Sequence, residues 1–182
     1  FYQQIIGAAN AFKEGDEAIG VAADDELSRE NARKLLANTT IEAITNNSLF
    51  KDGQDELIRK TTDQVKYAKV KNMTMGELKN FLLTRTEADI KAVMGGLHSD
   101  VIGSVVKLMS NEELIRVGQK IFNTLPGSKI GAKGYMSARI QPNSPTDNVE
   151  DIQWQVLDGF SYAVGDIVIG TNPVDSQLEA TL

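Results

Sequence analysis

The sequence predicts an α-helical amino-terminal region over residues 1–126, followed by a strand–helix–strand unit over residues 127–182. Three observations predict this fold class. Apolar residues recur at helical spacing through the first region, and several helix-start signals precede them. In the second region, two short apolar runs flank an amphipathic stretch. Each run is stopped by a proline, at Pro142 and Pro173, about one strand-plus-helix repeat apart.

Two long stretches of the first region have the pattern of amphipathic helices. The stretch DELSRENARKLLANTT, residues 25–40, combines leucines with good helix formers. The stretch DELIRKTTDQVKYAKVKN, residues 55–72, places its apolar residues along one helical stripe. That stripe consists of Leu57, Ile58, Val65 and Ala68.

Three short helices should follow, because a hydroxyl residue precedes an acidic residue by three positions at each start. The pairs are Thr74 with Glu77, Thr86 with Asp89, and Ser110 with Glu113. A glycine pair at 95–96 is typical of a helix end. His98, the single histidine, is expected at the surface or between helices, since no catalytic partner stands near it in the sequence.

Composition excludes several classes of function. The chain has 25 acidic and 19 basic residues and a net charge of −6, without a basic stripe, so a nucleic-acid partner is not expected. With no cysteine and one histidine, it can form neither a thiolate nor a multi-histidine metal site. No apolar run approaches the roughly 18 residues of a membrane span, and the first residues lack the pattern of a signal peptide. We therefore expect a cytoplasmic protein without a membrane partner.

The second region begins with the stretch GYMSARIQPNSP, residues 134–145, which predicts a strand. Side chains alternate faces along a strand. One face is apolar, with Met136, Ala138 and Ile140. The other carries Ser137, Arg139 and Gln141.

An amphipathic helix and a second strand should complete this unit. Asp147 and Glu150 are the expected caps of the helix, and Trp154 is expected to pack in the core or against a neighbouring element. The apolar run from Ile167 to Ile169 suits a strand buried on both faces, as in parallel sheets covered by helices. The whole is a βαβ unit with an expected right-handed crossover.

Hydrogen-bonding side chains gather where the two strands end. Arg139 and Gln141 close the first strand, and Asn172 follows the second. Because ligands of parallel α/β sheets bind at the carboxyl ends of strands, these side chains predict a site for a small polar molecule. Two other interpretations stay open: Arg139 could pair with a buried acid, and the two amides could bond their own turns.

The segments SARIQPN and GFSYAVGDIVIGTNPVDS resemble the large subunit family of ethanolamine ammonia-lyase. Upstream, GVAADDELSRENARKLLANTTIEAITNN and GLHSDVIGSVVKLMSNEELI are similar to the same family, so the resemblance covers nearly the whole chain. There are departures. The family usually reads Ile-Pro-Gly-Thr-Phe where this chain has AKGYM, and Ala163 stands where glycine is usual.

The resemblance implies a helical region followed by the start of a TIM-type (β/α)8 barrel, with adenosylcobalamin over the carboxyl end of the barrel. It implies that Arg139 and Asn172 bind the hydroxyl of a small amino alcohol and that Gln141 lies near its amino group. Pro173 matches a position that contacts the cobalamin. No residue of this chain would itself perform the radical chemistry, which the cofactor supplies.

A complete barrel takes about 250 residues, whereas only two strands are predicted here. We therefore expect an amino-terminal portion of the large subunit, inactive alone. The implied partners are the small subunit, other large subunits and the substrate, in the cytoplasm or a bacterial microcompartment. The alternative is a non-catalytic helical module used for assembly, with the βαβ unit as a remnant.

Overall fold

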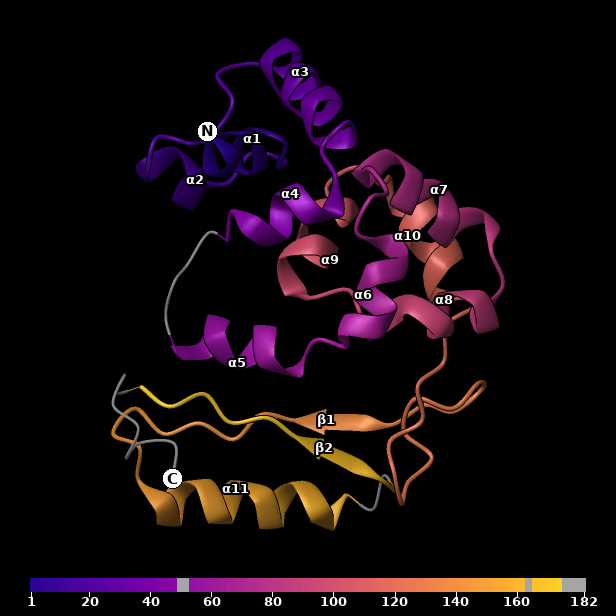
Figure 1. The fold of residues 1–182 in the computed structure, drawn as a ribbon. Coiled ribbons are helices and arrows are strands. Elements are labelled where there is room, and N and C mark those ends of the chain that lie inside the picture. The colour runs from indigo at the N-terminus through magenta and orange to yellow at the C-terminus, as the bar shows by residue number, and fades with distance from the viewer. Residues whose placement is uncertain (49–52, 163–164, 175–182) are drawn as a thin grey trace. The chain divides into compact units, whose positions relative to one another are not determined.

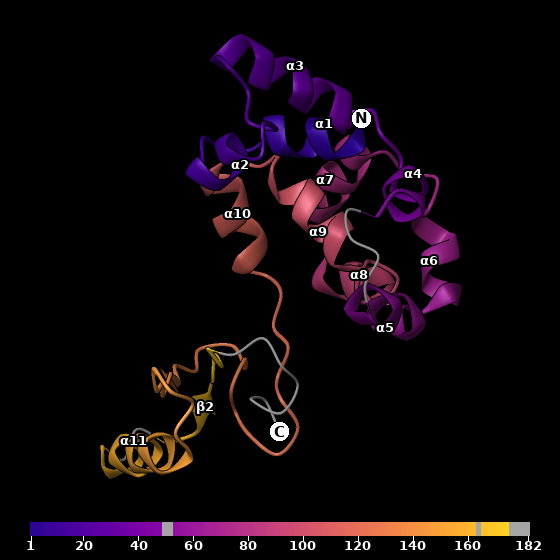
Figure 2. The same cartoon turned by 90° about the vertical axis from the view of Figure 1, so that its left-hand side faces the viewer.

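The computed structural model describes residues 1–48, 53–162 and 165–174, except the side chains of residues 54 and 55. The chain divides into two compact units, Phe1–Ile121 and Phe122–Leu182 (Figures 1 and 2). The first unit is helical and the second holds a small parallel sheet. No helix in the described ranges is long and apolar enough to cross a membrane.

Short helices make up the first unit. They are α1 Tyr2–Ala8, α2 Glu14–Ala18, α3 Glu26–Ala37, α4 Ile41–Asn46, α5 Gly53–Thr61, α6 Gln64–Val70, α7 Met75–Thr84, α8 Glu87–Met94, α9 Ser99–Val106 and α10 Asn111–Gly118. The single helix expected over residues 55–72 is wrong, because helix α5 ends at Thr61 and a separate helix, α6, begins at Gln64. The Asp63 carboxylate accepts the N–H groups of Val65 and Lys66 and so begins α6.

The three predicted capping boxes are confirmed at the starts of α7, α8 and α10. In each, the hydroxyl accepts the backbone N–H three residues ahead, while the acidic side chain accepts the N–H of the cap residue. The predicted helix end at 95–96 is also confirmed, since Gly95 caps α8. His98 lies between helices, with Nε2 2.8 Å from the Thr45 hydroxyl of α4. Local polar contacts thus set these helix boundaries.

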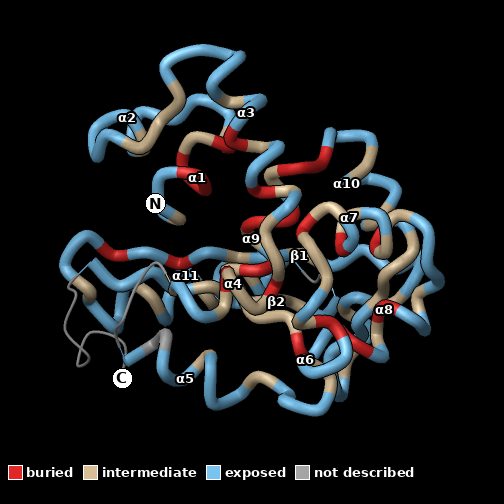
Figure 3. Tube along the Cα trace, turned by 45° about the horizontal axis from the view of Figure 1, so that its top comes forward, coloured by how far each residue is buried: buried red, intermediate tan, exposed pale blue. Residues whose placement is uncertain are grey.

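The hydrophobic core of the first unit lies where α3, α4, α7 and α9 meet. Figure 3 shows these buried segments in red. The largest fully buried apolar side chains are Leu36, Ile41, Ile44, Val70, Met75, Leu78, Val101 and Val105. Every member of this core cluster falls within residues 5–109. The first unit therefore has a core of its own, as an independently stable domain requires.

The second unit is a strand, a helix and a strand. Strand β1 (Ala138–Ile140) pairs in parallel with β2 (Ile167–Ile169), and helix α11 (Val149–Ser161) connects them. Arg139 stands opposite Val168 in the register. Beyond the strands, the Gly170 N–H donates to the Ile140 carbonyl at 3.0 Å. The predicted βαβ unit is confirmed.

Helix α11 packs on one face of this sheet. A Cβ at Gly159 would lie 2.9 Å from the Ile140 Cδ1, so the glycine lets the helix approach the apolar face of β1. Two predictions about packing are wrong. Trp154 is 71% exposed because it lies on the side of α11 away from Gly159, and Ile169 is 45% exposed. In the described part of this unit, α11 is the one helix against the two strands, so β2 is not buried on both faces.

The predicted caps of α11 are also wrong. Its cap is Asn148, whose side chain accepts the Asp151 N–H at 3.0 Å. Asp147 has a φ of 52°, in the left-handed region, and its carboxylate accepts the Val174 N–H instead. A tertiary contact therefore takes the side chain that the sequence pattern assigned to the helix.

Gly96 should be essential for the crossing of α6 and α8. A Cβ at position 96 would collide with the backbone of Lys66 and Tyr67, whereas Gly103 in α9 has open space around it. We expect Gly96→Ala to lower the free energy of unfolding by about 1–3 kcal/mol. Gly103→Ala, the matched control, should raise it by up to about 1 kcal/mol through helix propensity. Urea unfolding followed by far-ultraviolet circular dichroism measures both, and an unchanged stability for Gly96→Ala would contradict the packing described.

The Glu113 carboxylate makes the stability of the first unit depend on pH. Its contact with Lys79 Nζ, 2.8 Å away, and the Ser110 N–H hold the pKa of Glu113 below its ordinary value of 4.5. A carboxyl whose folded pKa is lowered stabilises the fold above its unfolded pKa and loses this contribution as the pH falls. The unfolding free energy should therefore decline as the pH drops below 4.5 toward the lower folded value.

Glu113→Gln should make this decline shallower in urea titrations at several pH values. Glu30→Gln, at an exposed position of α3, is the control and should keep the wild-type slope. Equal slopes for wild type and Glu113→Gln would refute the role of this carboxylate.

Candidate functional site

The two parallel strands bring their carboxyl ends to one edge of the sheet. We call this edge the carboxyl end of the sheet, formed by residues 139–141 and 170–174. It carries all four residues that the sequence singled out. Arg139 lies in β1 and Gln141 directly after it, while Asn172 and Pro173 follow β2. The pairing register places them on neighbouring chain segments.

The Arg139 guanidinium lies over Gly170 of the neighbouring segment. A Cβ at position 170 would be 2.6 Å from the Arg139 Nη2 and 2.9 Å from Nε. The side chain therefore leans across the sheet toward the segment that carries Asn172. Any residue other than glycine at position 170 would have to displace it.

Arg139 keeps its donors available. The residue is exposed, and in the described ranges no carboxylate lies within ion-pair distance of it. Among the described residues, Arg139 therefore has no acid to pair with, and the interpretation that it pairs with a buried acid is not supported there. A guanidinium presents five N–H donors in a planar fork, which suits hydroxyl and other oxygen acceptors of a ligand.

Both amide side chains are exposed at this edge. Gln141 borders a shallow groove of about 430 Å³, together with Ile140, Pro142 and Gly159. Asn172 lies two residues beyond Gly170. In the part of the chain that the structure describes, neither amide bonds its own turn, so both remain able to bind a ligand. No hydrogen bond joins Gln141 or Asn172 to Arg139 in these described ranges.

The loop after β1 is joined to α11 by side-chain hydrogen bonds. The buried Ser144 hydroxyl accepts the N–H of Asn148 at 3.0 Å and lies 3.4 Å from an Asp151 carboxylate oxygen. The Gln155 side chain accepts the N–H of Asn143 at 2.9 Å and donates to its carbonyl at 2.7 Å. These side-chain bonds take the place of backbone pairing and fix the loop beside the carboxyl end of the sheet.

Two carboxylates join loops at opposite ends of the strands. At the carboxyl end, Asp147 Oδ1 accepts the Val174 N–H at 2.8 Å and so joins the loops after β1 and β2. At the amino end, Asp166 Oδ2 accepts the Lys129 N–H at 2.9 Å. Sequence reasoning missed the tie at Asp147. The available signal was an aspartate in a turn, one of the residue types that most readily adopts positive φ.

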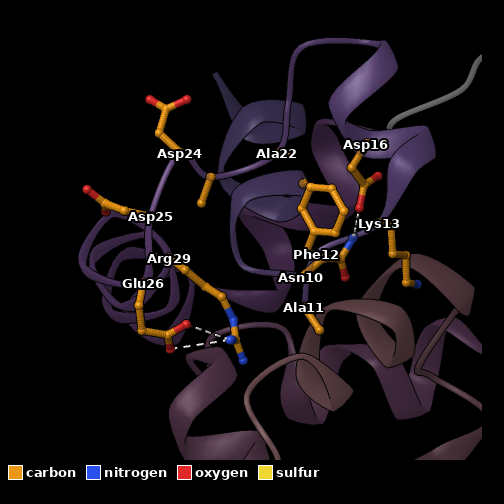
Figure 4. Close-up of a pocket in the computed structure, with 12 residues that line it drawn as sticks. Asn10, Ala11, Phe12, Lys13, Asp16, Ala22, Asp24, Asp25, Glu26 and Arg29 are labelled. Atoms are coloured by element: carbon orange, nitrogen blue, oxygen red, sulfur yellow. Dashed lines mark hydrogen bonds and ion pairs between the residues drawn. The ribbon is translucent and has the colours of Figure 1, made fainter.

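A second hollow, of about 220 Å³, lies between α1, α2 and α3 of the first unit (Figure 4). Several of its polar side chains are already engaged within the protein. Arg29 pairs with Glu26 at 2.9 Å, and the Asn10 amide donates to Asp16 at 2.7 Å. Over the described ranges, no group of three or more histidine or acidic side chains could hold a metal ion. We therefore place the candidate site at the carboxyl end of the sheet.

Comparison with known proteins covers the whole chain. Residues 1–182 match the family described as ethanolamine ammonia lyase large subunit (EutB). The chain is 33% identical to the ethanolamine ammonia-lyase large subunit of Salmonella typhimurium strain LT2, over 97% of this chain and 40% of that relative. It is 34% identical to that of Escherichia coli strain K12, with the same coverage.

The chain thus spans 40% of the length of the curated relatives it matches. The family match nevertheless includes both units and every residue of the candidate site. This chain belongs to the ethanolamine ammonia-lyase large subunit family.

Proposed function

We propose that this chain contributes the first substrate-binding strands of an adenosylcobalamin-dependent ethanolamine ammonia-lyase, which converts ethanolamine to acetaldehyde and ammonia. One observation carries the proposal. The exposed Arg139 guanidinium leans over Gly170 at the carboxyl end of a parallel sheet, within a chain matched to this family over its full length. Ligands of parallel α/β sheets bind at this end.

The second unit has the order and pairing of elements that a barrel segment has. A parallel strand, a helix packed on one face and a second parallel strand are the repeating unit of a (β/α)8 barrel. The face that carries Arg139 and Val168 is opposite the one that packs on α11, and it would be the barrel interior. We infer that β1 and β2 are the first two barrel strands.

Each polar residue has a role that its chemistry supports. The Arg139 fork donates hydrogen bonds to the substrate hydroxyl, and the Asn172 amide adds a second contact to the same group. The carbonyl oxygen of the Gln141 side chain accepts from the amino group. Three oriented contacts of this kind hold a small amino alcohol in one pose, which is the main contribution that a protein makes to a cofactor-driven reaction.

The residues at this edge fit a large planar cofactor. Residues 171–174 are exposed, Gly170 projects no side chain, and Pro173 presents an apolar ring without an N–H donor. An exposed segment with an apolar ring beside a glycine suits contact with a corrin ring. Adenosylcobalamin, when bound, supplies the radical chemistry. This chain's own residues bind and orient the substrate beside it and limit its contact with water.

We propose that the 182-residue chain is inactive alone, since it spans 40% of its relatives. The relatives are named as large subunits, which implies a small-subunit partner. Association with further large subunits and residence in the cytoplasm or a microcompartment belong to the same proposal.

The proposal is tested in the full-length protein combined with its small subunit. Arg139→Ala should lower kcat/KM for ethanolamine by roughly 100-fold, the size of a lost charged hydrogen bond to substrate. Gly170→Ala should also lower it, because the added Cβ displaces the guanidinium. In the Arg139→Ala background, Gly170→Ala should have little further effect, since both changes remove the same interaction.

Gly118→Ala in α10, where a Cβ meets nothing within 4 Å, is the matched control and should keep wild-type activity. Near-normal turnover by Arg139→Ala would refute its assigned role. Additive losses in the double variant would refute the link between Gly170 and Arg139.

A second function, a helical assembly module, is supported by the separate core of the first unit. All of its core cluster lies within residues 5–109, whereas Pro142 and Ser144 are the buried residues among those described in the second unit. We expect residues 1–121 alone to unfold cooperatively in urea. Capture of the small subunit by this piece would favour the module; a non-cooperative transition would exclude it.

A further inference from the structure

We propose that Asp147 is a positioning residue for the substrate site: its carboxylate holds the segment that carries Asn172 and Pro173 at the carboxyl end of the sheet. This inference rests on the proposed function. It is carried by the hydrogen bond from the Val174 N–H to Asp147 Oδ1, which is 2.8 Å long and joins residues from two loops. Hydrogen bonds to an ionised acceptor are about twice as strong as neutral ones.

The segment 171–173 is held at both of its ends. Before it, the Gly170 N–H donates to the Ile140 carbonyl at the end of β1. After it, the Val174 N–H donates to Asp147 in the loop that follows β1. Residues 171–173 therefore lie between two hydrogen bonds, and both bonds are made to the chain segment that runs from β1 to α11. Pro173 further restricts the backbone of Asn172 to extended conformations. The direction of the Asn172 side chain thus depends on both anchors.

The backbone of Asp147 indicates that this contact is built into the loop. Within the described ranges, Asp147 is the one non-glycine residue with positive φ, at 52°. Aspartate adopts this conformation more readily than most residues with a Cβ, yet it still carries a cost, so it persists where surrounding contacts favour it. A simple helix cap would not need it, and Asn148 already caps α11.

The loop that carries Asp147 is bonded to α11. The side chains of Ser144 and Gln155 join the residues on either side of Asp147 to α11, through bonds of 2.7–3.0 Å to the backbone of Asn143 and Asn148. Asp147 itself donates its N–H to the Ser144 carbonyl at 3.2 Å. The anchor for Val174 is therefore connected to the sheet through α11, and it does not rely on the exposed segment that it holds.

Three substitutions separate the carboxylate's role from backbone strain. Asp147→Asn keeps an acceptor oxygen and tolerates positive φ. Asp147→Gly relieves the strain but removes the acceptor. Asp147→Ala removes the acceptor and also disfavours the positive φ. Asp166→Ala is the matched control, because it removes an equivalent carboxylate-to-backbone bond at the amino end of the same sheet.

Steady-state kinetics with ethanolamine are measured on the full-length protein with its small subunit. Asp147→Gly and Asp147→Ala should raise KM by roughly 10-fold or more, with a smaller change in kcat, whereas Asp147→Asn should stay within about 3-fold of wild type. Wild-type KM in Asp147→Gly would overturn the proposal, because strain alone would then explain the residue. An equal rise in Asp166→Ala would overturn it too, because loosening anywhere in the sheet would then suffice.

Hydrogen exchange provides a readout that does not depend on turnover. In the same protein, peptides covering residues 170–174 should exchange faster in Asp147→Gly than in wild type or Asp166→Ala. Unchanged exchange would overturn the anchor itself. If ethanolamine is not a substrate of the wild-type protein, the proposed function fails while the exchange result still tests the anchor, so the two failures are distinguishable.

Discussion

The parallel pairing of β1 with β2 is the constraint on which the candidate site depends. Parallel strands direct their carboxyl ends to the same edge, so residues far apart in sequence become neighbours there. The pairing requires a crossover helix, and α11 can lie close because Gly159 meets Ile140 without a side chain between them. Replacing this packing would shift the strands and, with them, the segment that lies under Arg139.

The two units are stabilised in different ways. The helical unit buries a continuous apolar cluster, and polar caps determine where its short helices begin. The sheet unit buries little apolar surface and relies on side chains that bind backbone groups, at Gln155, Asp147 and Asp166. Such bonds are directional, so they specify a geometry more strongly than they add stability. A binding edge requires such geometry.

Sequence patterns predicted those features that neighbouring residues determine. The capping boxes at Thr74, Thr86 and Ser110 were predictable because donor and acceptor lie three residues apart. The break at Asp63 was missed because an apolar stripe continues through it, and the burial of Trp154 was wrong because helical spacing does not say which face meets the sheet. The cap of α11 was misassigned to Asp147 for a related reason: its carboxylate is used across the sheet.

The sequence by itself determined the family, the strand–helix–strand order and the four candidate residues at the strand ends, because motifs and periodicity are local properties. Only the tertiary structure decided which chain segments come together around them. The approach of Arg139 to Gly170 and the bond from Val174 to Asp147 join separate segments of the chain. No spacing rule encodes such contacts, because they follow from strand register and from the packing of α11, which exist only after the chain has folded.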